Sequence, residues 1–451
     1  MLRRIGLRRS FLLAALVVGS AACSDESPTL SGDPFFPGGV RPTTRELIIP
    51  AGAAFRPLGV FGGYSTSNDV AYAVVANRYQ GELSANAFSR TAGGFPGELR
   101  YTQDNNNRSD TIYRAVSGSL IVRLDSASSS AGPVTLQVYR AGQDWDAATA
   151  TWENAVDSAG VRTRWTTPGG TRGALLSQAV YTAATAGDSL VLPLDSVAVN
   201  ALRDTLGFGL MLSTAETGSR LQINQADRPP VLRVGLRPAT PVRDTVILTD
   251  IALGGEPNTF VYTPEPPQPT GVLAAGGIRS IRSLFSLQFP DSVDACPAPQ
   301  APCGRVALSD VSLNRVSLVL RRLPTPAAFT PLDSTVLSVF TITEPELGRR
   351  APLGDPVLDP NFRVVGLIRN QLSPQQAAVF APGDTTVELD FTGFATASVR
   401  GDTVPTNFAL LGGPSVGVPS VRRFETFGLA AFALEPRLRI VYTPRARAEL
   451  P

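Results

Sequence analysis

The chain of 451 residues contains no histidine, and it contains no lysine either, so all 40 of its basic residues are arginine. Without histidine it has no Ser-His-Asp or Cys-His catalytic group, no imidazole general base and no imidazole metal ligand. Without lysine, Schiff-base chemistry and the phosphate-binding lysine of Walker loops are excluded as well. We therefore expect a protein that is not an enzyme and that uses no cofactor.

After its first 22 residues the chain has no apolar run approaching the 18 residues of a membrane-spanning helix. It also has no arginine-rich stripe. Removal of the four arginines in residues 1–22 leaves a net charge of −2. We therefore expect no nucleic-acid partner. A hydrophobic fraction of 43% is ordinary for a globular protein, and the length suits two or three domains.

Residues 1–22 have the composition of an export signal. Arginines 3, 4, 8 and 9 precede an apolar run from Phe11 to Val18, and small residues lead to Cys23. The junction resembles a bacterial lipobox, which predicts lipidation of Cys23, followed by a flexible spacer over residues 23–44. Ordinary cleavage beside an incidental cysteine is the alternative, and both general and twin-arginine export remain open. We expect an exported protein held at the membrane by its lipid in the bacterial cell envelope, with the outer membrane favoured.

Two further cysteines, Cys296 and Cys303, flank a short proline-rich loop. An exported chain meets an oxidising compartment, so the spacing favours a disulfide, which by loop entropy contributes only about 2 kcal/mol. A metal pair is the alternative, but it lacks two further ligands.

The chain repeats itself at offsets of about 190–210 residues. Six segments recur in the same order: 45–50 and 243–248, 68–72 and 258–262, 109–123 and 309–321, 188–195 and 384–390, 206–212 and 406–411, and 228–234 and 435–442. We predict two diverged copies of one domain, over residues 45–238 and 239–444, with a tail at 445–451.

Each copy has the pattern of an all-β domain. Short β-branched or aromatic runs are bounded by Gly, Pro, Asn and Asp clusters: 119–124, 134–139, 317–320, 336–340 and 438–442. We predict two tandem antiparallel β-sandwiches of jelly-roll type. Residues 195–206 and 374–381 are predicted to carry one helical turn each.

Residues 134–155 resemble the central signature of DNRLRE-type domains, in which a strand precedes an Asp-Trp and a Thr-Trp pair. Here these pairs are Asp144-Trp145 and Thr151-Trp152, and copy two has residues 341–347 in their place. The family comprises bacterial surface β-sandwiches related to carbohydrate-binding modules. The resemblance implies a sandwich fold, surface placement and, for some members, polysaccharide binding.

All three tryptophans of the chain lie in this stretch or soon after it. Indole faces stack on sugar rings, but large aromatic residues are more often core residues. We predict that Trp145 and Trp152 belong to the core. Trp165, flanked by Arg162 and Arg164, is the predicted exposed glycan contact, with those two arginines beside it.

Oxygen-bearing residues cluster at Asp104, Asn106 and Asp110, a weak candidate calcium site for which an Asx-rich turn between strands is the favoured interpretation. Glycosidic hydrolysis needs only paired carboxylates, for which the sequence offers five: Asp144, Asp146, Glu153, Asp188 and Asp195. Because acidic residues in turns are mostly solvated, we predict no catalytic residue here.

Two functions remain in front after these exclusions, with a glycan-degrading enzyme that uses carboxylates a distant third. The first is a non-catalytic surface binding or adhesion module, with polysaccharide as its possible ligand. The second is a structural envelope scaffold with a protein partner. An exposed tryptophan beside a groove favours the first, and a flat apolar patch favours the second.

Overall fold

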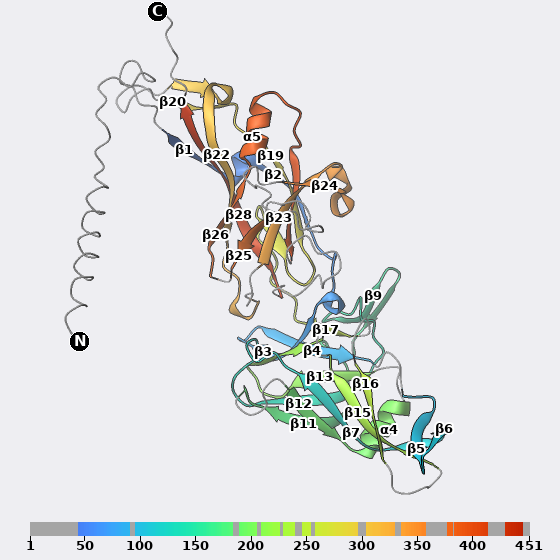
Figure 1. The fold of residues 1–451 in the computed structure, drawn as a ribbon. Coiled ribbons are helices and arrows are strands. Elements are labelled where there is room, and N and C mark those ends of the chain that lie inside the picture. Colours follow the sequence, from blue (N-terminus) through green and yellow to red (C-terminus); the bar gives the residue numbers. More distant parts are fainter. Residues whose placement is uncertain are drawn as a thin grey trace, which may run out of the picture.

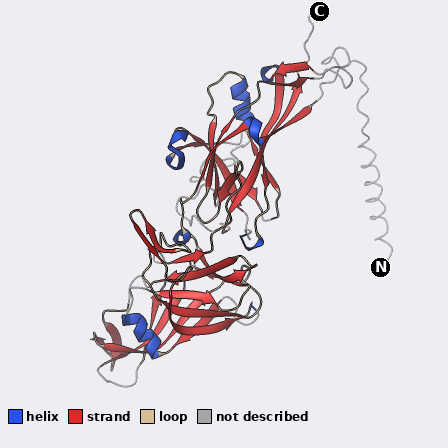
Figure 2. Ribbon diagram, turned by 180° about the vertical axis from the view of Figure 1, so that it is seen from behind, coloured by secondary structure: helices blue, strands red, loops and turns tan. Residues whose placement is uncertain are grey.

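The computed structural model describes residues 44–90, 95–183, 189–204, 209–225, 229–239, 246–253, 258–295, 304–329, 335–357, 377–381, 383–413 and 429–444. These residues form two antiparallel β-sandwiches, which confirms the predicted all-β class (Figures 1 and 2). No helix in the described ranges has the length and apolar character that crossing a bilayer requires.

The first sandwich consists of a small and a large sheet. The small sheet has the spatial order β12 (Ser189–Leu194), β7 (Tyr113–Arg123), β15 (Val231–Pro238) and β16 (Ile247–Ala252). The large sheet has the order β11 (Arg172–Tyr181), β8 (Val134–Ala141), β13 (Leu210–Thr214), β4 (Leu83–Ser89), β3 (Tyr72–Tyr79) and β14 (Ser219–Asn224), with β17 (Thr259–Tyr262) also paired to β4.

Shorter elements decorate this first sandwich. They are the hairpins β5 (Leu99–Gln103) with β6 (Asn106–Asp110) and β9 (Asn154–Ser158) with β10 (Val161–Arg164), the helix α4 (Ser196–Asp204) and the 3₁₀ turn η1 (Ser67–Asp69). The helical turn predicted over residues 195–206 is therefore confirmed.

The second sandwich also has two sheets. Its small sheet has the order β26 (Thr386–Asp390), β22 (Val311–Arg322), β28 (Ala431–Pro444) and β1 (Arg45–Pro50), with β18 (Leu273–Gly276) also on β28. Its large sheet has the order β2 (Phe55–Phe61), β19 (Arg282–Leu287), β27 (Asn407–Gly413), β23 (Thr335–Ile342) and β24 (Leu353–Pro356), with β25 (Ala377–Phe380) also on β23.

The remaining elements of the second sandwich are the hairpin β20 (Ser292–Ala295) with β21 (Gly304–Ala307), the helices α2 (Ala51–Ala54) and α5 (Thr392–Val399), and the 3₁₀ turns η2 (Leu308–Asp310), η3 (Ala327–Phe329) and η4 (Pro345–Arg350). The helical turn predicted over residues 374–381 is wrong, because residues 377–380 form β25, which pairs with β23.

Alternating side chains explain why each sheet buries one face. In β12, Leu190, Leu192 and Leu194 point into the first core, whereas Val191 between them is 54% exposed. The strand β1 alternates in the same way, and its Leu47 and Ile49 pack against the second core. Each sandwich thus encloses its own apolar core.

The two sandwiches correspond strand by strand. The small-sheet order β12-β7-β15-β16 matches β26-β22-β28-β1, and a helix follows the first strand of each series, α4 or α5. The register matches as well, since Leu120 pairs with Leu232 where Leu318 pairs with Leu438. Even a β-bulge recurs, with the extra residue at position 116 in β7 and at position 314 in β22.

The first two strands of each copy are exchanged between the sandwiches. β1 pairs with β28 and β2 with β19, so residues 45–61 complete the second sandwich. Reciprocally, β16 pairs with β15 and β17 with β4, so residues 247–262 complete the first. In Figure 1 the blue strands β1 and β2 accordingly lie among the orange and red strands.

The exchange corrects the strand content predicted for residues 45–238 and 239–444. A sequence repeat shows which segments are equivalent, but not which sheet each strand joins. Residues 62–71 and 263–272, here called the two connectors, each span up to about 33 Å when extended, which allows them to cross between sandwiches. The connectors therefore meet at the junction of the two bodies.

Candidate functional site

Residues 142–171, here called the Trp loop, cover the outer face of the large sheet in the first sandwich. Beneath the loop lie Phe88 of β4 and Met211 of β13, which are cross-strand partners. Both residues alternate with neighbours that point into the sandwich core, so they face outward and need a cover. The tryptophans of the loop provide it.

Trp145 and Trp165 are both core residues. Trp145 is 3% exposed, its ring centroid lies 5.4 Å from that of Phe88, and the Arg90 guanidinium lies 4.4 Å from its ring centre. Trp165 is 5% exposed, stacks on Phe88 at 5.1 Å, and donates a hydrogen bond from Nε1 to the carbonyl of Thr151 at 2.8 Å. The structure agrees with the prediction for Trp145, whereas the expectation that Trp165 is exposed is wrong.

Pairing with β9 explains the burial of Trp165. The register shifts between Thr163 and Arg164, with Ala155 of β9 as the extra residue, and Ala155 is buried in the same cluster as the tryptophan. The Trp165 amide continues the pairing by donating to the Glu153 carbonyl at 3.1 Å. The side chains of Arg162 and Arg164 stay in solvent on β10, while the next residue turns toward Phe88.

The prediction that Trp152 belongs to the core is wrong, because the core does not enclose this residue. It is half-buried, packs at the edge of the cluster around Phe88, and lines a cleft. Its ring rests on Gly169, where an added Cβ would lie 2.5 Å from the indole, and the Gly169 amide donates to the Trp152 carbonyl at 2.7 Å. Gly169 has a φ of +84°, a conformation that favours glycine. The glycine thus fixes the position of this indole.

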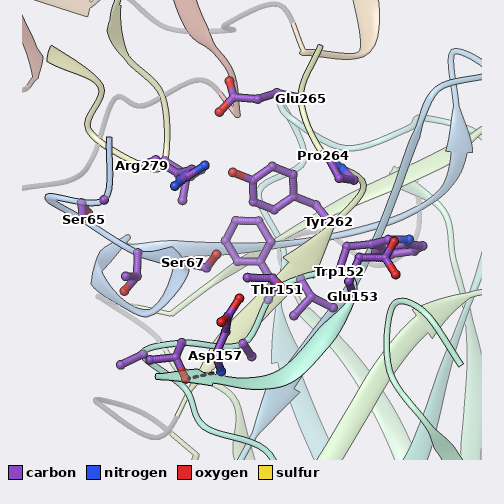
Figure 3. Close-up of a pocket in the computed structure, with 18 residues that line it drawn as sticks. Ser65, Ser67, Thr151, Trp152, Glu153, Asp157, Tyr262, Pro264, Glu265 and Arg279 are labelled. Carbon is purple, nitrogen blue, oxygen red and sulfur yellow. Dashed lines mark hydrogen bonds between the residues drawn. The ribbon is translucent and has the colours of Figure 1, made fainter. Parts of the chain in front are cut away.

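The cleft has a volume of about 540 Å³ and is lined by three groups of segments. The Trp loop supplies Thr149, Thr151, Trp152, Glu153 and Asp157; the connectors supply Ser65, Thr66, Ser67, Pro264 and Glu265; β17 and the turn after β18 supply Phe260, Tyr262, Ile278 and Arg279. Figure 3 shows the Tyr262 hydroxyl turned toward Arg279 and Glu265, with Trp152 and Glu153 on the opposite side. The cleft therefore combines one aromatic wall with hydroxyls and ionisable groups.

Both sandwiches contribute to this cleft. The backbone amides of Gly63 and Tyr64 donate to the Arg279 carbonyl, at 2.8 and 3.3 Å, which ties the first connector to the turn between β18 and β19. Glu265 of the second connector accepts a hydrogen bond from the Ala431 amide at 3.0 Å. Since Ala431 begins β28, each connector is fastened to the second sandwich beside the cleft.

The electrostatics of the cleft follow from this packing. Burial raises the pKa of Glu265, while the Ala431 amide and Arg279 oppose the rise. Burial also raises the pKa of Tyr262, and the nearby Glu265 charge adds to that effect. The phenol is therefore a neutral hydrogen-bonding group at physiological pH.

Arg162 and Arg164 lie outside the cleft. Both are exposed on β10, but Arg162 reaches Asp157 of the cleft lining with an Nε–Oδ1 distance of 2.9 Å. Arg164 is not among the lining residues. Of the two predicted arginines, the structure brings only Arg162 near the cleft.

The predicted calcium ligands are not brought together. Asp104 sits in the tight turn of the β5–β6 hairpin, and Asp110 pairs with Leu99 at its other end, about 13 Å away along the strand. Asn106 pairs beside the turn. The Asp110 carboxylate accepts the amides of Ile112 and Ala239, and the described residues contain no cluster of three ionisable metal ligands. The Asx-turn interpretation replaces the calcium site.

The carboxylates considered for hydrolysis have structural partners or lie apart. Asp144 pairs with Arg90, Asp146 accepts the Thr149 amide at 2.9 Å, and Asp195 accepts the Ala198 amide at 2.7 Å as α4 begins. Glu153 lines the cleft. Asp188, Cys23, Cys296 and Cys303 lie outside the described residues.

Several lining residues had no sequence signal. Ser65 lies 200 residues before Glu265 and 214 before Arg279, and only the exchange of strands brings the two connectors together. Tyr262 ends a segment that the sequence matched with residues 68–72, but the structure matches β17 with β2, because β17 pairs with β4 as β2 pairs with β19.

Comparisons with known proteins add little to this geometry. No protein-family model matches the chain, and no curated protein matches it. Among solved structures, the M60 catalytic domain with two CBM51 domains of Clostridium perfringens ZmpB is similar at 9% identity and a TM-score of 0.12, over 84% of this chain. The chain spans 38% of that structure, and at this TM-score the similarity supports no conclusion.

Proposed function

We propose that this protein is a non-catalytic binding module of the bacterial cell envelope that holds a segment of polysaccharide in the cleft beside Trp152. The observation that carries the proposal is the cleft itself, where a half-buried indole faces hydroxyl, carboxyl and guanidinium groups. The resemblance to DNRLRE-type domains points to the same class of ligand.

The chemistry of the lining suits a sugar. The apolar face of a pyranose ring stacks on an indole, and its hydroxyls pair with polar side chains such as Thr149, Thr151 and Glu153. A volume of about 540 Å³ lies within the range of small-ligand clefts, about 300–1,000 Å³. Trp152 takes the stacking role that the sequence had suggested for Trp165, because Trp165 is enclosed.

The cellular location of the module is part of the proposal. Lipidation of Cys23, after cleavage of the signal peptide, would hold the protein at the membrane, with the spacer of residues 23–44 between the anchor and β1. A disulfide between Cys296 and Cys303 fits this compartment. Their chain neighbours Ala295 and Gly304 are cross-strand partners in the β20–β21 ladder, which supports the pairing.

A structural scaffold is the second candidate, and one surface favours it. On the outer face of the first small sheet, Val191, Ile121 and Val231 stand in one cross-strand row, and Leu248 of β16 is 68% exposed. Exposed apolar residues on a sheet face of this kind, beside the Arg233–Asp250 ion pair, suit an envelope protein partner. The glycan proposal stays first, because the cleft combines stacking and polar groups in one place.

Trp152→Ala tests the proposed function. Affinity electrophoresis or calorimetry on a panel of bacterial, algal and plant glycans should show binding by the wild type and a loss of about fivefold in the variant, since a lost stacking contact is worth about 1 kcal/mol. Tyr101→Ala, on the distant hairpin β5–β6, removes a ring elsewhere and should bind like the wild type (Figure 1). Wild-type protein that binds no glycan would favour the scaffold.

A further inference from the structure

The strand pair β1–β2 closes both sheets of the second sandwich at once. β1 extends the small sheet beside β28, β2 extends the large sheet beside β19, and α2 joins them. The pair also contributes Leu47, Ile49 and Phe55 to the second core. The strand pair β1–β2, here called the plug, therefore docks on the second sandwich through two β-ladders and an apolar face.

Along the described chain, the plug is covalently continuous with the rest of the molecule only through the first connector. Its partners are far away in sequence; the ion pair between Glu46 and Arg439, at 2.7 Å, joins residues 393 positions apart. The second sandwich thus recognises the plug by the surface it presents and not by nearness along the chain.

Equivalent plug sites occur twice in one molecule. β16–β17 fills the corresponding place in the first sandwich, where Arg233 pairs with Asp250 as Arg439 pairs with Glu46. The structure thus shows that each sandwich accepts a strand pair that precedes the other copy. Acceptance from a separate chain needs the same surfaces and no new contact.

We propose that a second copy of this chain is a partner for the second sandwich, through reciprocal exchange of β1–β2 between two molecules. Within one molecule the plug has an effective concentration in the millimolar range, so the fraction of exchanged molecules should be about a tenth at ~0.1 mM chain and about tenfold less at ~0.01 mM. Exchange needs the plug to leave its site, so it should occur during refolding.

Cross-linking tests this inference. The Oγ1 atoms of Thr44 and Thr443 lie 3.3 Å apart at the end of the β1–β28 ladder. Chains from residue 24 with Cys296→Ser and Cys303→Ser would carry either Thr44→Cys or Thr443→Cys, be refolded together and then be oxidised. The expected result is a disulfide-linked heterodimer on a non-reducing gel whose yield rises with chain concentration.

Two controls make the result decisive. A mixture of Thr102→Cys with Thr443→Cys reports random oxidation, because Thr102 is exposed on the distant strand β5. The double variant Thr44→Cys/Thr443→Cys should close within one chain when oxidised while dilute. A heterodimer yield no greater than that of the Thr102 mixture would overturn the proposed exchange, and so would a double variant that folds but fails to close.

Discussion

The two sandwiches differ most at one equivalent position, the outer face of the large sheet. In the first sandwich the partners Phe88 and Met211 lie beneath Trp145 and Trp165. In the second, the corresponding partners are Leu284 and Ala409, which pack with Ile342. One scaffold thus carries a tryptophan cover in one copy and, in the other, a cluster of aliphatic residues with Phe61 packed against it.

The difference shows how one repeat acquired a site. The Trp loop, which carries the aromatic cover, also brings Trp152 to the junction where the connectors cross. In the second sandwich, the described cluster around Leu284 contains Phe61 but no tryptophan. We therefore expect glycan binding to belong to the first sandwich and its connectors.

The largest expected effect comes from removing the aromatic cover. Trp165→Ala should destabilise the protein by about 3–5 kcal/mol, because it leaves a cavity over Phe88. The matched change in the second sandwich, Ile342→Val, should cost only about 0.5–1.5 kcal/mol. Denaturant unfolding measures both. Equal losses of unfolding free energy in the two variants would remove the distinction between the two covers.

Gly169→Ala should have the next largest effect. The added methyl would meet the Trp152 ring at 2.5 Å in a backbone conformation that disfavours alanine, so a loss of about 1–3 kcal/mol is expected. The displaced indole should also weaken glycan binding. Gly160 has open space around it and a φ of the same sign. Gly160→Ala therefore measures the cost of the backbone conformation without the contact with the Trp152 ring. If both variants bind glycan equally, Gly169 does not position Trp152.

A smaller effect concerns the pH dependence of stability that Glu265 of the second connector produces. The pKa of Glu265 is raised above its ordinary value of 4.5, so ionising it costs more in the folded state than in the unfolded state. Wild-type stability should therefore fall relative to Glu265→Gln as the pH rises from about 4.5 toward neutrality. Thermal melts across this range measure the difference. The exposed Glu82→Gln should run parallel to the wild type.

The smallest effect concerns the edges where the exchanged strands dock. Among the residues that the structure describes, Arg439 pairs with both Glu46 and Glu388, whereas Arg233 pairs with Asp250. Arg439→Met should lower the melting temperature slightly more than Arg233→Met at low salt, because it breaks two ion pairs. Both shifts should shrink near 1 M salt, where the Debye length is about 3 Å. Salt-independent shifts would assign the loss to packing.

Local patterns predicted the strands well and their partners poorly. The runs at 119–124, 317–320 and 438–442 lie in β7, β22 and β28, because alternation records which face is buried. The repeat was visible because similar segments recur in the same order in both copies. Exchange of the first strands leaves no such trace, because alternation within a strand records which face is buried and not which sheet the strand joins.

The candidate site shows the same limit. The clustering of tryptophans pointed to the Trp loop, but the polar neighbours of Trp165 suggested exposure, and its burial depends on the pairing of its strand with β9. The connector residue Glu265 and Arg279 of the turn after β18 became recognisable only once the fold brought their segments together. Contacts across long sequence separations decide these features.

Unfolding of two fragments tests the strand exchange most directly. Residues 62–266 contain every described strand of the first sandwich, including β16 and β17, whereas residues 45–238 lack that pair and carry β1–β2 instead. The structure predicts cooperative thermal unfolding for 62–266 and no cooperative transition of comparable midpoint for 45–238. A fragment 45–238 that unfolds cooperatively at the same or a higher temperature would contradict the exchange.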